Sequence, residues 1–183
     1  LAKDIALAKQ TQRVLIAFSK RAAAEKTTML AQEFAESFQR LARKDDMSVS
    51  ADINPENFKV TLKNREGRSI DKEELSAGEK QIYAIAMLEA LAKTSGRKLP
   101  IIIDTPLGRL DSNHRDKLVN NYFPTASHQV VILSTDTEVD EQFYRDLNKH
   151  ISHSYKLEYD PATGHTTASE SYFWKNAMKA EAA

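Results

Sequence analysis

The sequence of 183 residues contains no cysteine, and only five glycines and five prolines. The absence of cysteine excludes disulfides, thiolate zinc sites and a cysteine nucleophile, and it fits a reducing compartment. No apolar stretch approaches the roughly 20 residues of a membrane span, and the N-terminus lacks the charged-then-apolar pattern of a signal peptide. We therefore expect a soluble, cytoplasmic protein without a membrane partner.

The sequence also lacks an excess of charge of either sign, because 26 basic residues balance 26 acidic ones. Bulk electrostatics therefore give no argument for nucleic acid, and any contact with DNA must come from a local patch. The candidate patch is a set of basic residues between Lys3 and Lys26, which Asp4 and Glu25 dilute. A solvated helix face is the alternative interpretation of these residues.

Residues 1–44 contain no proline or glycine and have the composition of a long helix, which would extend roughly 60 Å. The segment is either the end of a coiled-coil arm that enters a globular head, or an amphipathic helix packed on the domain. We expect a boundary after residue 46, with a globular lobe at residues 47–183. Apolar residues recur at helical spacing in each half of the helix: Leu7, Val14 and Phe18, then Leu30, Phe34, Phe38 and Leu41.

The rest of the chain alternates predicted strands with predicted helices. Residues 99–104 and 129–133 are short apolar runs of the kind found in strands buried on both faces of a parallel sheet. This alternation predicts an α/β fold with a parallel-strand core. The other expected elements are a hairpin at residues 47–62, with Phe58 in its second strand, a helix that ends near Gly96 with Ile82, Ile85, Leu88 and Leu91 on its apolar face, helices at 111–122 and 139–150, and a closing hairpin at 154–173.

Two positions carry groups that suit nucleotide chemistry. Residues 75–81 place the Ser76 hydroxyl and the Gly78 backbone at the start of a predicted helix, where free N–H groups and the helix dipole favour phosphate. An ordinary N-cap is the alternative interpretation of Ser76. Asp104 ends a predicted strand, where open α/β sheets present ligand-binding groups, and its carboxylate suits either Mg²⁺ or the cap of a turn.

The two positions lie in segments that resemble motifs of one family. Residues 101–111 resemble the Walker B strand and the following D-loop of the ATP-binding-cassette (ABC) ATPases, and residues 75–81 resemble their signature motif. Residues 132–136 match the switch region. With a helical arm in front, the similarity over approximately residues 47–174 looks like the C-terminal half of an SMC-type head. The wording of the motifs closely resembles the DndD family, the ATPases of bacterial DNA phosphorothioation, in which sulfur replaces an oxygen of the backbone phosphate.

The resemblance implies that ATP and Mg²⁺ are bound between two heads. Ser76 would bond the γ-phosphate of ATP held by the opposite protomer, and the Gly78 amide would face the same charge. Asp104 would coordinate Mg²⁺, and Asp111 would belong to the D-loop that crosses the dimer interface. The implied nucleotide-binding residues are Ser76, Ala77, Gly78, Glu79 and Asp111. The implied partners are an N-terminal half of the same protein that carries the Walker A loop, a second protomer in a head-to-head homodimer, DNA, and other phosphorothioation proteins.

Three residues depart from the family pattern. Ala77 stands where the family usually has a second glycine, Thr105 where a glutamate polarises the attacking water, and Thr135 where the switch region commonly has a histidine. Threonine cannot act as a general base near neutral pH. Hydrolysis is then slow, or Asp136 or Glu138 supplies the missing group. The implied catalytic residues are Asp104, Thr105, Thr135 and Asp136.

The sequence contains no Gly-x-x-x-x-Gly-Lys-Ser/Thr loop, so the backbone cradle and the lysine for the β- and γ-phosphates are missing. We therefore expect that this polypeptide alone does not hydrolyse ATP. In SMC-type proteins this loop lies in an N-terminal half, beyond a long coiled coil. The resemblance thus implies one lobe of a split head, with Leu1 at a cut in the arm or at the start of a segment.

Other kinds of catalytic site have little support in the sequence. His150 and His153 lack a nearby third zinc ligand, and no nucleophile-elbow glycine pattern accompanies the serines. Two other functions stay compatible with the motifs. One is another coiled-coil ABC ATPase in DNA repair or anti-phage defence. The other is a nonhydrolysing module that uses the ABC fold as a dimerisation platform, which Thr105 and Thr135 favour.

Overall fold

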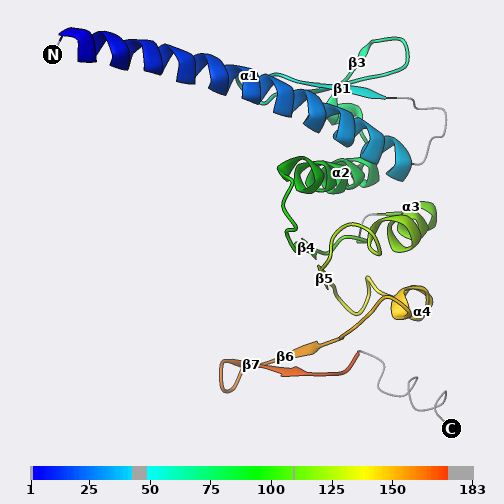
Figure 1. Cartoon of the computed structure of the whole chain (residues 1–183). Coiled ribbons are helices and arrows are strands. Elements are labelled where there is room, and N and C mark those ends of the chain that lie inside the picture. The colour runs from blue at the N-terminus through cyan, green and yellow to red at the C-terminus, as the bar shows by residue number, and fades with distance from the viewer. Residues whose placement is uncertain (1, 43–48, 109, 173–183) are drawn as a thin grey trace. The chain divides into compact units, whose positions relative to one another are not determined.

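The computed structural model describes residues 2–42, 49–108 and 110–172, which are drawn in colour in Figure 1. The chain divides into two compact units, residues 1–133 and 134–183. The expected boundary after residue 46 lies outside the described residues, as do residues 173–183. The first unit contains α1 (Ala2–Leu41), β1 (Ser50–Ile53), β2 (Val60–Lys63), β3 (Ser69–Ile70), η1 (Lys72–Glu74), α2 (Ala77–Ser95), β4 (Ile101–Asp104), α3 (Ser112–Lys117), η2 (Leu118–Tyr122) and β5 (Val130–Leu133). The second contains α4 (Glu141–Asn148), β6 (Lys156–Asp160) and β7 (His165–Ser169).

The second half of α1 forms the core of the first unit with α2, and β1 packs against α1 as well. Phe34, Phe38 and Leu41 are at most 1% exposed, as their helical spacing predicts for one buried face. The Phe34 ring meets the Tyr83 ring of α2 edge to face, with 4.8 Å between ring centroids. Such aromatic pairs add to the stabilisation that burial of their area provides.

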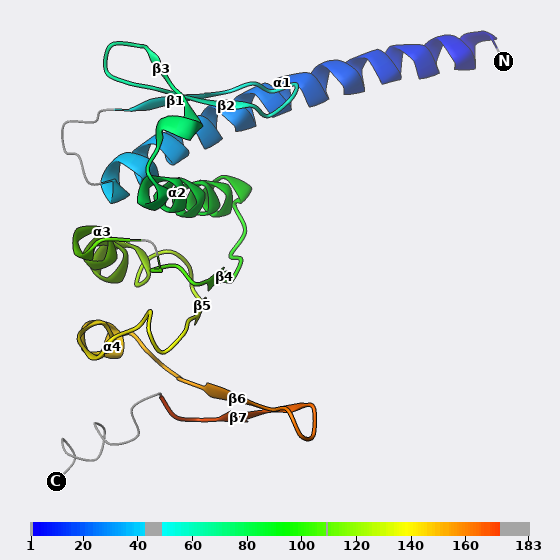
Figure 2. The ribbon, with the colours of Figure 1, turned by 180° about the vertical axis from the view of Figure 1, so that it is seen from behind.

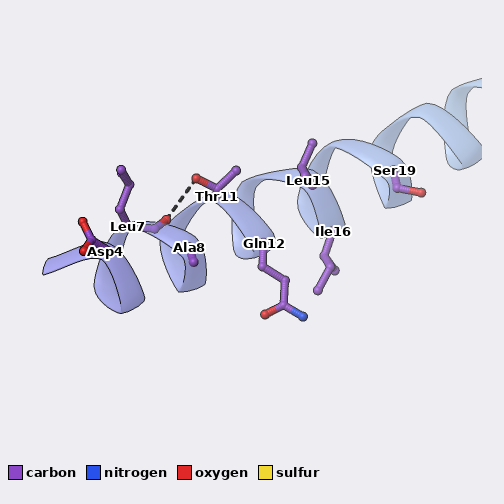
Figure 3. Close-up of a pocket in the computed structure, with 8 residues that line it drawn as sticks. All are labelled: Asp4, Leu7, Ala8, Thr11, Gln12, Leu15, Ile16 and Ser19. Atoms are coloured by element: carbon purple, nitrogen blue, oxygen red, sulfur yellow. Dashed lines mark hydrogen bonds between the residues drawn. The ribbon is translucent and has the colours of Figure 1, made fainter. Parts of the chain in front are cut away.

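The first half of α1 is exposed. Leu7, Val14 and Phe18 are 62–70% accessible, although they repeat at the spacing of an apolar stripe. A shallow depression on this half is lined by residues of α1 alone, shown in Figure 3: Asp4, Leu7, Ala8, Thr11, Gln12, Leu15, Ile16 and Ser19. The long helix is therefore confirmed and its second half packs on the domain, while a coiled-coil arm for the first half stays a prediction. Within the described ranges, no helix combines the length and apolar character needed to cross a membrane.

A buried carboxylate ties α1 to α2 beside the aromatic cluster. Glu89 is 4% exposed and accepts two hydrogen bonds from Nη2 of Arg40, at 2.5 and 2.6 Å. Lys93 adds an ion pair to Glu89 at 3.1 Å and another to Glu33 at 3.3 Å. Burial disfavours the charged ammonium, but the two carboxylates outweigh burial and hold the pKa of Lys93 above its usual value. Burial, and then the charge of Glu89, raises the pKa of the adjacent Tyr122 hydroxyl.

The sheet formed by β1, β2 and β3 is antiparallel, with Ile53 paired to Val60 and Leu62 paired to Ile70. The hairpin of β1 and β2 was expected, but the third strand of the sheet, β3, was not. Phe58 was expected in the second strand and lies instead in the connecting turn, with φ at 55° and 64% of its surface exposed. The Asn54 carbonyl accepts the Phe58 N–H at 2.8 Å, so the turn bends back before β2 begins.

Helix α2 starts and ends where the sequence predicts. Its C-cap is Gly96 in the left-handed conformation, with φ at 65°, and the Gly96 N–H donates to the Lys93 carbonyl. The predicted apolar face is only partly correct, because Leu88 and Leu91 are 43% and 48% exposed. The residues that α2 buries are Ile82, Tyr83, Ile85, Ala86, Glu89 and Ala90.

Strands β4 and β5 are parallel, and the pairing runs from Ile101 with Val130 to Asp104 with Leu133. This confirms the predicted parallel α/β core. The prediction that β4 is buried on both faces is wrong for this chain, because Ile102 is 63% exposed while its neighbours on the strand are buried. The predicted helix after Asp111 is α3 followed by the π-helical turn η2, in which the Phe123 N–H donates to the Leu118 carbonyl at 2.9 Å.

The second unit contains one helix and one hairpin. Asp140 caps α4 by accepting the Phe143 N–H at 2.8 Å, and the helix buries Phe143 and Leu147. The β6–β7 hairpin, seen from behind in Figure 2, is antiparallel from Lys156 with Ser169 to Asp160 with His165. Both elements were expected from the sequence, with the helix starting two residues later than predicted.

Replacement of Phe38 by Ala should lower the free energy of unfolding by about 3–5 kcal/mol, because it leaves a cavity between α1 and α2. The matched control is Phe18→Ala on the same helix, which should change stability by less than about 0.5 kcal/mol because the ring is exposed. Urea unfolding followed by circular dichroism measures both. Equal losses for the two variants would contradict the packing described for α1.

Candidate nucleotide-binding site

The start of α2 is a reciprocal cap built by the signature-like segment. Ser76 is the N-cap, and its Oγ accepts the Glu79 N–H at 3.2 Å. The Glu79 carboxylate accepts the Ser76 N–H in return, at 2.8 Å. Leu75, just before the cap, is 5% exposed and anchors the segment. The N-cap interpretation of Ser76 is therefore confirmed as geometry, and Glu79 belongs to the cap.

The cap leaves groups that suit an anion. A serine hydroxyl that accepts one hydrogen bond still has its own proton to donate. The amides of Ala77 and Gly78 belong to the first turn, where N–H groups have no partner within a helix. Ser76 and Ala77 are exposed and Gly78 is half-buried, so solvent reaches this turn. The 19-residue length of α2 adds a helix dipole whose positive end lies here.

Asp104 and Thr105 lie at the carboxyl end of β4, and both are exposed. In the described ranges, no group of three or more His, Cys, Asp or Glu side chains is arranged to hold a metal ion. Mg²⁺ is usually held by one or two carboxylates together with substrate phosphates, so a single carboxylate fits this ion when a nucleotide is also bound. Thr105 has φ at 47°, which is unusual for a β-branched residue.

The structure brings the two motifs together through a residue that the sequence analysis did not single out. Nε2 of Gln81, on the first turns of α2, donates to the Thr105 carbonyl at 3.0 Å. The only signal in the sequence was the place of Gln81 within residues 75–81. The contact joins positions 24 residues apart, and neither helical nor strand periodicity predicts it.

Asp111 is the N-cap of α3, as its position before the helix predicts. Its Oδ1 accepts the His114 N–H at 3.0 Å and lies 3.0 Å from Nδ1 of the same histidine. His114 is 5% exposed, so this carboxylate is fixed by a buried ring. Asp111 itself remains exposed. A residue with a role across an interface needs such an accessible position.

Thr135 and Asp136 belong to the second unit and are exposed. The Thr135 hydroxyl lies 3.2 Å from that of Thr137, and the Thr135 carbonyl accepts the Glu138 N–H at 3.2 Å. Glu138 is 4% exposed, so Asp136 is the more accessible of the two carboxylates considered for water activation.

Tyr172 packs beside this segment in the second unit, with its ring centroid 4.4 Å from that of Tyr144. Burial raises the pKa of Tyr172 to about 12, although a hydrogen bond with the Ser134 side chain acts in the opposite direction. The Tyr172 hydroxyl is thus neutral at physiological pH.

No protein-family profile matches the chain, and no curated protein matches it in sequence. Its fold is similar to solved SMC ATPase heads. A structure from work on ATP-driven dimerisation and DNA-stimulated activation of SMC ATPases is 17% identical with a TM-score of 0.59, and the match covers 87% of this chain and 93% of that chain.

The SMC head with a coiled coil and joint from Pyrococcus yayanosii is 17% identical, with a TM-score of 0.58 and coverage of 83% and 28%. The head with an extended coiled coil bound to the C-terminal domain of ScpA, from Pyrococcus furiosus, is 15% identical, with a TM-score of 0.55 and coverage of 78% and 35%. This chain therefore matches only 28% and 35% of the lengths of those two chains. The chain has the fold of an SMC ATPase head, which confirms the predicted α/β fold class.

The second unit should lose stability at alkaline pH because of Tyr172. A tyrosine whose pKa rises from 10 to about 12 on folding contributes stability that is complete below pH 10 and is lost as the pH rises toward 12. Tyr172→Phe should remove this part of the pH dependence. Urea midpoints of both proteins, measured as the pH is raised through this range, test the prediction. Parallel curves for the two proteins would contradict it.

Proposed function

We propose that this chain is the C-terminal lobe of an SMC-type ABC ATPase head that binds ATP and Mg²⁺ between two heads. One observation carries the proposal: in an SMC-head fold, the capped start of α2 is hydrogen-bonded through Gln81 to the strand end that bears Asp104. One hydrogen bond therefore links the helix start that bears the proposed phosphate donors to the strand end that bears the proposed metal ligand. Such a surface suits a nucleotide that two proteins share.

Ser76 and the first amides of α2 are proposed to bind the γ-phosphate of a nucleotide carried by the other head. The Ser76 hydroxyl keeps its proton for this bond, because its lone pair serves the Glu79 N–H. The cap thus holds the hydroxyl in place before ATP arrives, which reduces the entropy lost on binding. The exposed Asp111, fixed by His114, is proposed to cross the same interface.

Asp104 would hold Mg²⁺, which would neutralise phosphate charge in the shared site. Beside it, Thr105 can orient a water through its hydroxyl but cannot accept the proton of that water near neutral pH. Asp136 is exposed and lies in the segment that resembles the switch region, and it is proposed as the general base of the complete head. The phosphate-binding loop would come from an N-terminal half of the same protein. We expect slow hydrolysis, with ATP acting mainly to hold two heads together.

The residue sequence of the motifs, which resembles that of the DndD family, supports a more specific proposal: ATP-dependent head association serves DNA phosphorothioation. The sulfur chemistry is proposed to belong to partner enzymes. One of the similar structures comes from SMC ATPases whose dimerisation is driven by ATP and whose activation is stimulated by DNA. We propose the same two properties here, with the chain in the cytoplasm and DNA contacted through the basic residues of α1.

A nonhydrolysing dimerisation module is the second candidate. It is favoured by Thr105 and Thr135, which stand where catalytic groups are expected. The two candidates agree that ATP brings heads together, and they differ in turnover. Measurement of phosphate release by the associated heads separates them.

Ser76→Asp tests the shared nucleotide without loss of the fold. Aspartate is as good an N-cap as serine, so the stability of the chain should change by less than about 0.5 kcal/mol, but its charge repels the γ-phosphate. We expect ATP-dependent association of the complete protein, this chain with its phosphate-loop half, to weaken by at least about tenfold. Light scattering with and without ATP·Mg²⁺ measures it.

The matched control is Asn57→Asp, which adds the same charge in an exposed turn. The Asn57 side-chain oxygen accepts the Lys59 N–H, and an aspartate oxygen can accept the same bond. It should associate like the wild type. If the wild type does not associate with ATP, or if Ser76→Asp associates as well as the control, the proposed function is wrong.

The phosphorothioation proposal has a separate test in cells. Cells that produce only the Ser76→Asp protein should lose phosphorothioate linkages from their DNA, as measured by mass spectrometry after nuclease digestion. Cells with Asn57→Asp should keep them. Unmodified DNA in the wild-type cells would contradict a phosphorothioation role and leave DNA repair or anti-phage defence as the use of the same head.

A further inference from the structure

Gln81 connects the start of α2 to the end of β4, and the chemistry fixes the direction of its amide. The Thr105 carbonyl can only accept a hydrogen bond, so the amide nitrogen of Gln81 must face it, at 3.0 Å. The amide oxygen therefore points the other way. It is buried, and in the described part of the chain it has no hydrogen-bond partner.

An unpaired, buried acceptor is costly, and an apolar side chain of similar size avoids that cost. Gln81 is thus a poor choice for stability alone. Among the described residues, the only hydrogen bond of the Gln81 side chain is the one to the Thr105 carbonyl, 24 residues away. The hydrogen bond to Thr105 is the contact that Gln81 gains in return among the described residues.

Thr105 is held in a strained conformation from both sides. Its φ of 47° lies in the left-handed region, where a β-branched residue persists only if its surroundings determine it. The Thr105 N–H donates to the Leu133 carbonyl of β5 at 2.8 Å, which fixes the peptide before the residue. Gln81 fixes the carbonyl after it. Together the two bonds determine how the chain leaves β4.

We propose that Gln81 is a positioning residue that holds Thr105 in its left-handed conformation and so directs the side chains of Asp104 and Thr105. It does this from the helix that carries Ser76, five residues earlier in the chain. A shift in the first turn of α2 is thereby transmitted through one side chain to the end of β4 that bears Asp104. The catalytic meaning of this role rests on the proposed function, whereas the backbone role does not.

Hydrogen exchange of the Thr105 amide tests the backbone role in the chain without nucleotide. Gln81→Met keeps the side-chain volume and removes the N–H donor to the Thr105 carbonyl. Protection of the Thr105 amide from exchange should then fall about tenfold, the ratio that corresponds to one hydrogen bond of typical net strength. The urea midpoint should not fall, since an unpaired oxygen is also removed. The control is Gln32→Met, where an exposed amide bonds Glu36 on its own helix, and it should leave Thr105 unchanged.

The Thr105→Gly background separates a positioning role of Gln81 from a packing role, because a packing role would affect the exchange of residue 105 equally in both backgrounds. Thr105→Gly relieves the left-handed strain, so Gln81→Met in that background should change the exchange of residue 105 less than it does in the wild type. An unchanged Thr105 amide in Gln81→Met would overturn the inference. So would an effect of the same size in the glycine background, because Gln81 would then act through packing.

The complete ATPase tests the catalytic meaning. Gln81→Met should lower kcat about tenfold with little change in KM for ATP, while Gln32→Met keeps both constants. Wild-type turnover with an unaffected Gln81→Met variant would overturn the inference and leave the proposed function intact. Absence of ATP-dependent association in the wild type would defeat the proposed function, and the exchange of the Thr105 amide would then decide the role of Gln81 alone.

Discussion

The packing of α2 against the second half of α1 is the interaction on which the first unit depends. The Tyr83 ring meets Phe34, and the buried Glu89 carboxylate binds Arg40, so α2 is fixed along its length by both apolar and ionic contacts. Removal of one partner of a buried ion pair is strongly destabilising, because it leaves an uncompensated charge. With α2 fixed in this way, its N-terminal turn has a defined place, and every proposed nucleotide contact from this turn follows from that.

The fold and the proposed function use the same atoms at the start of α2. Ser76 satisfies a helix amide through its oxygen, and its proton remains for a ligand. The Glu79 carboxylate accepts the hydrogen bond of the Ser76 amide in return. The cap is therefore complete without nucleotide, and a ligand adds bonds to it without replacing any. A preformed cap of this kind suits the proposed binding of a nucleotide that another protein carries.

Local chemistry made much of this structure predictable from sequence. The Ser76 and Asp111 caps and the helix end at Gly96 follow from residue type and periodicity within short segments. The parallel pairing of β4 with β5 follows from the alternation of strands and helices along the chain. The positive φ of Thr105 does not follow from such patterns, because bonds to Leu133 and Gln81, distant in sequence, determine it. The exposure of Ile102 does not follow from the sequence either. An apolar run shows which side chains a strand could bury, but it does not show whether another element packs over them.

The central claim is that the signature-like turn of one protomer meets a nucleotide held by another. Mixed dimers test it directly, with one protomer isotopically labelled and only that protomer able to load an ATP analogue that is photoreactive at its γ-phosphate. Crosslinking followed by mass spectrometry identifies the modified peptide. The account predicts attachment to residues 75–81 of the unlabelled protomer. Attachment to the same segment of the labelled protomer, or no attachment to residues 75–81 in either, would contradict it.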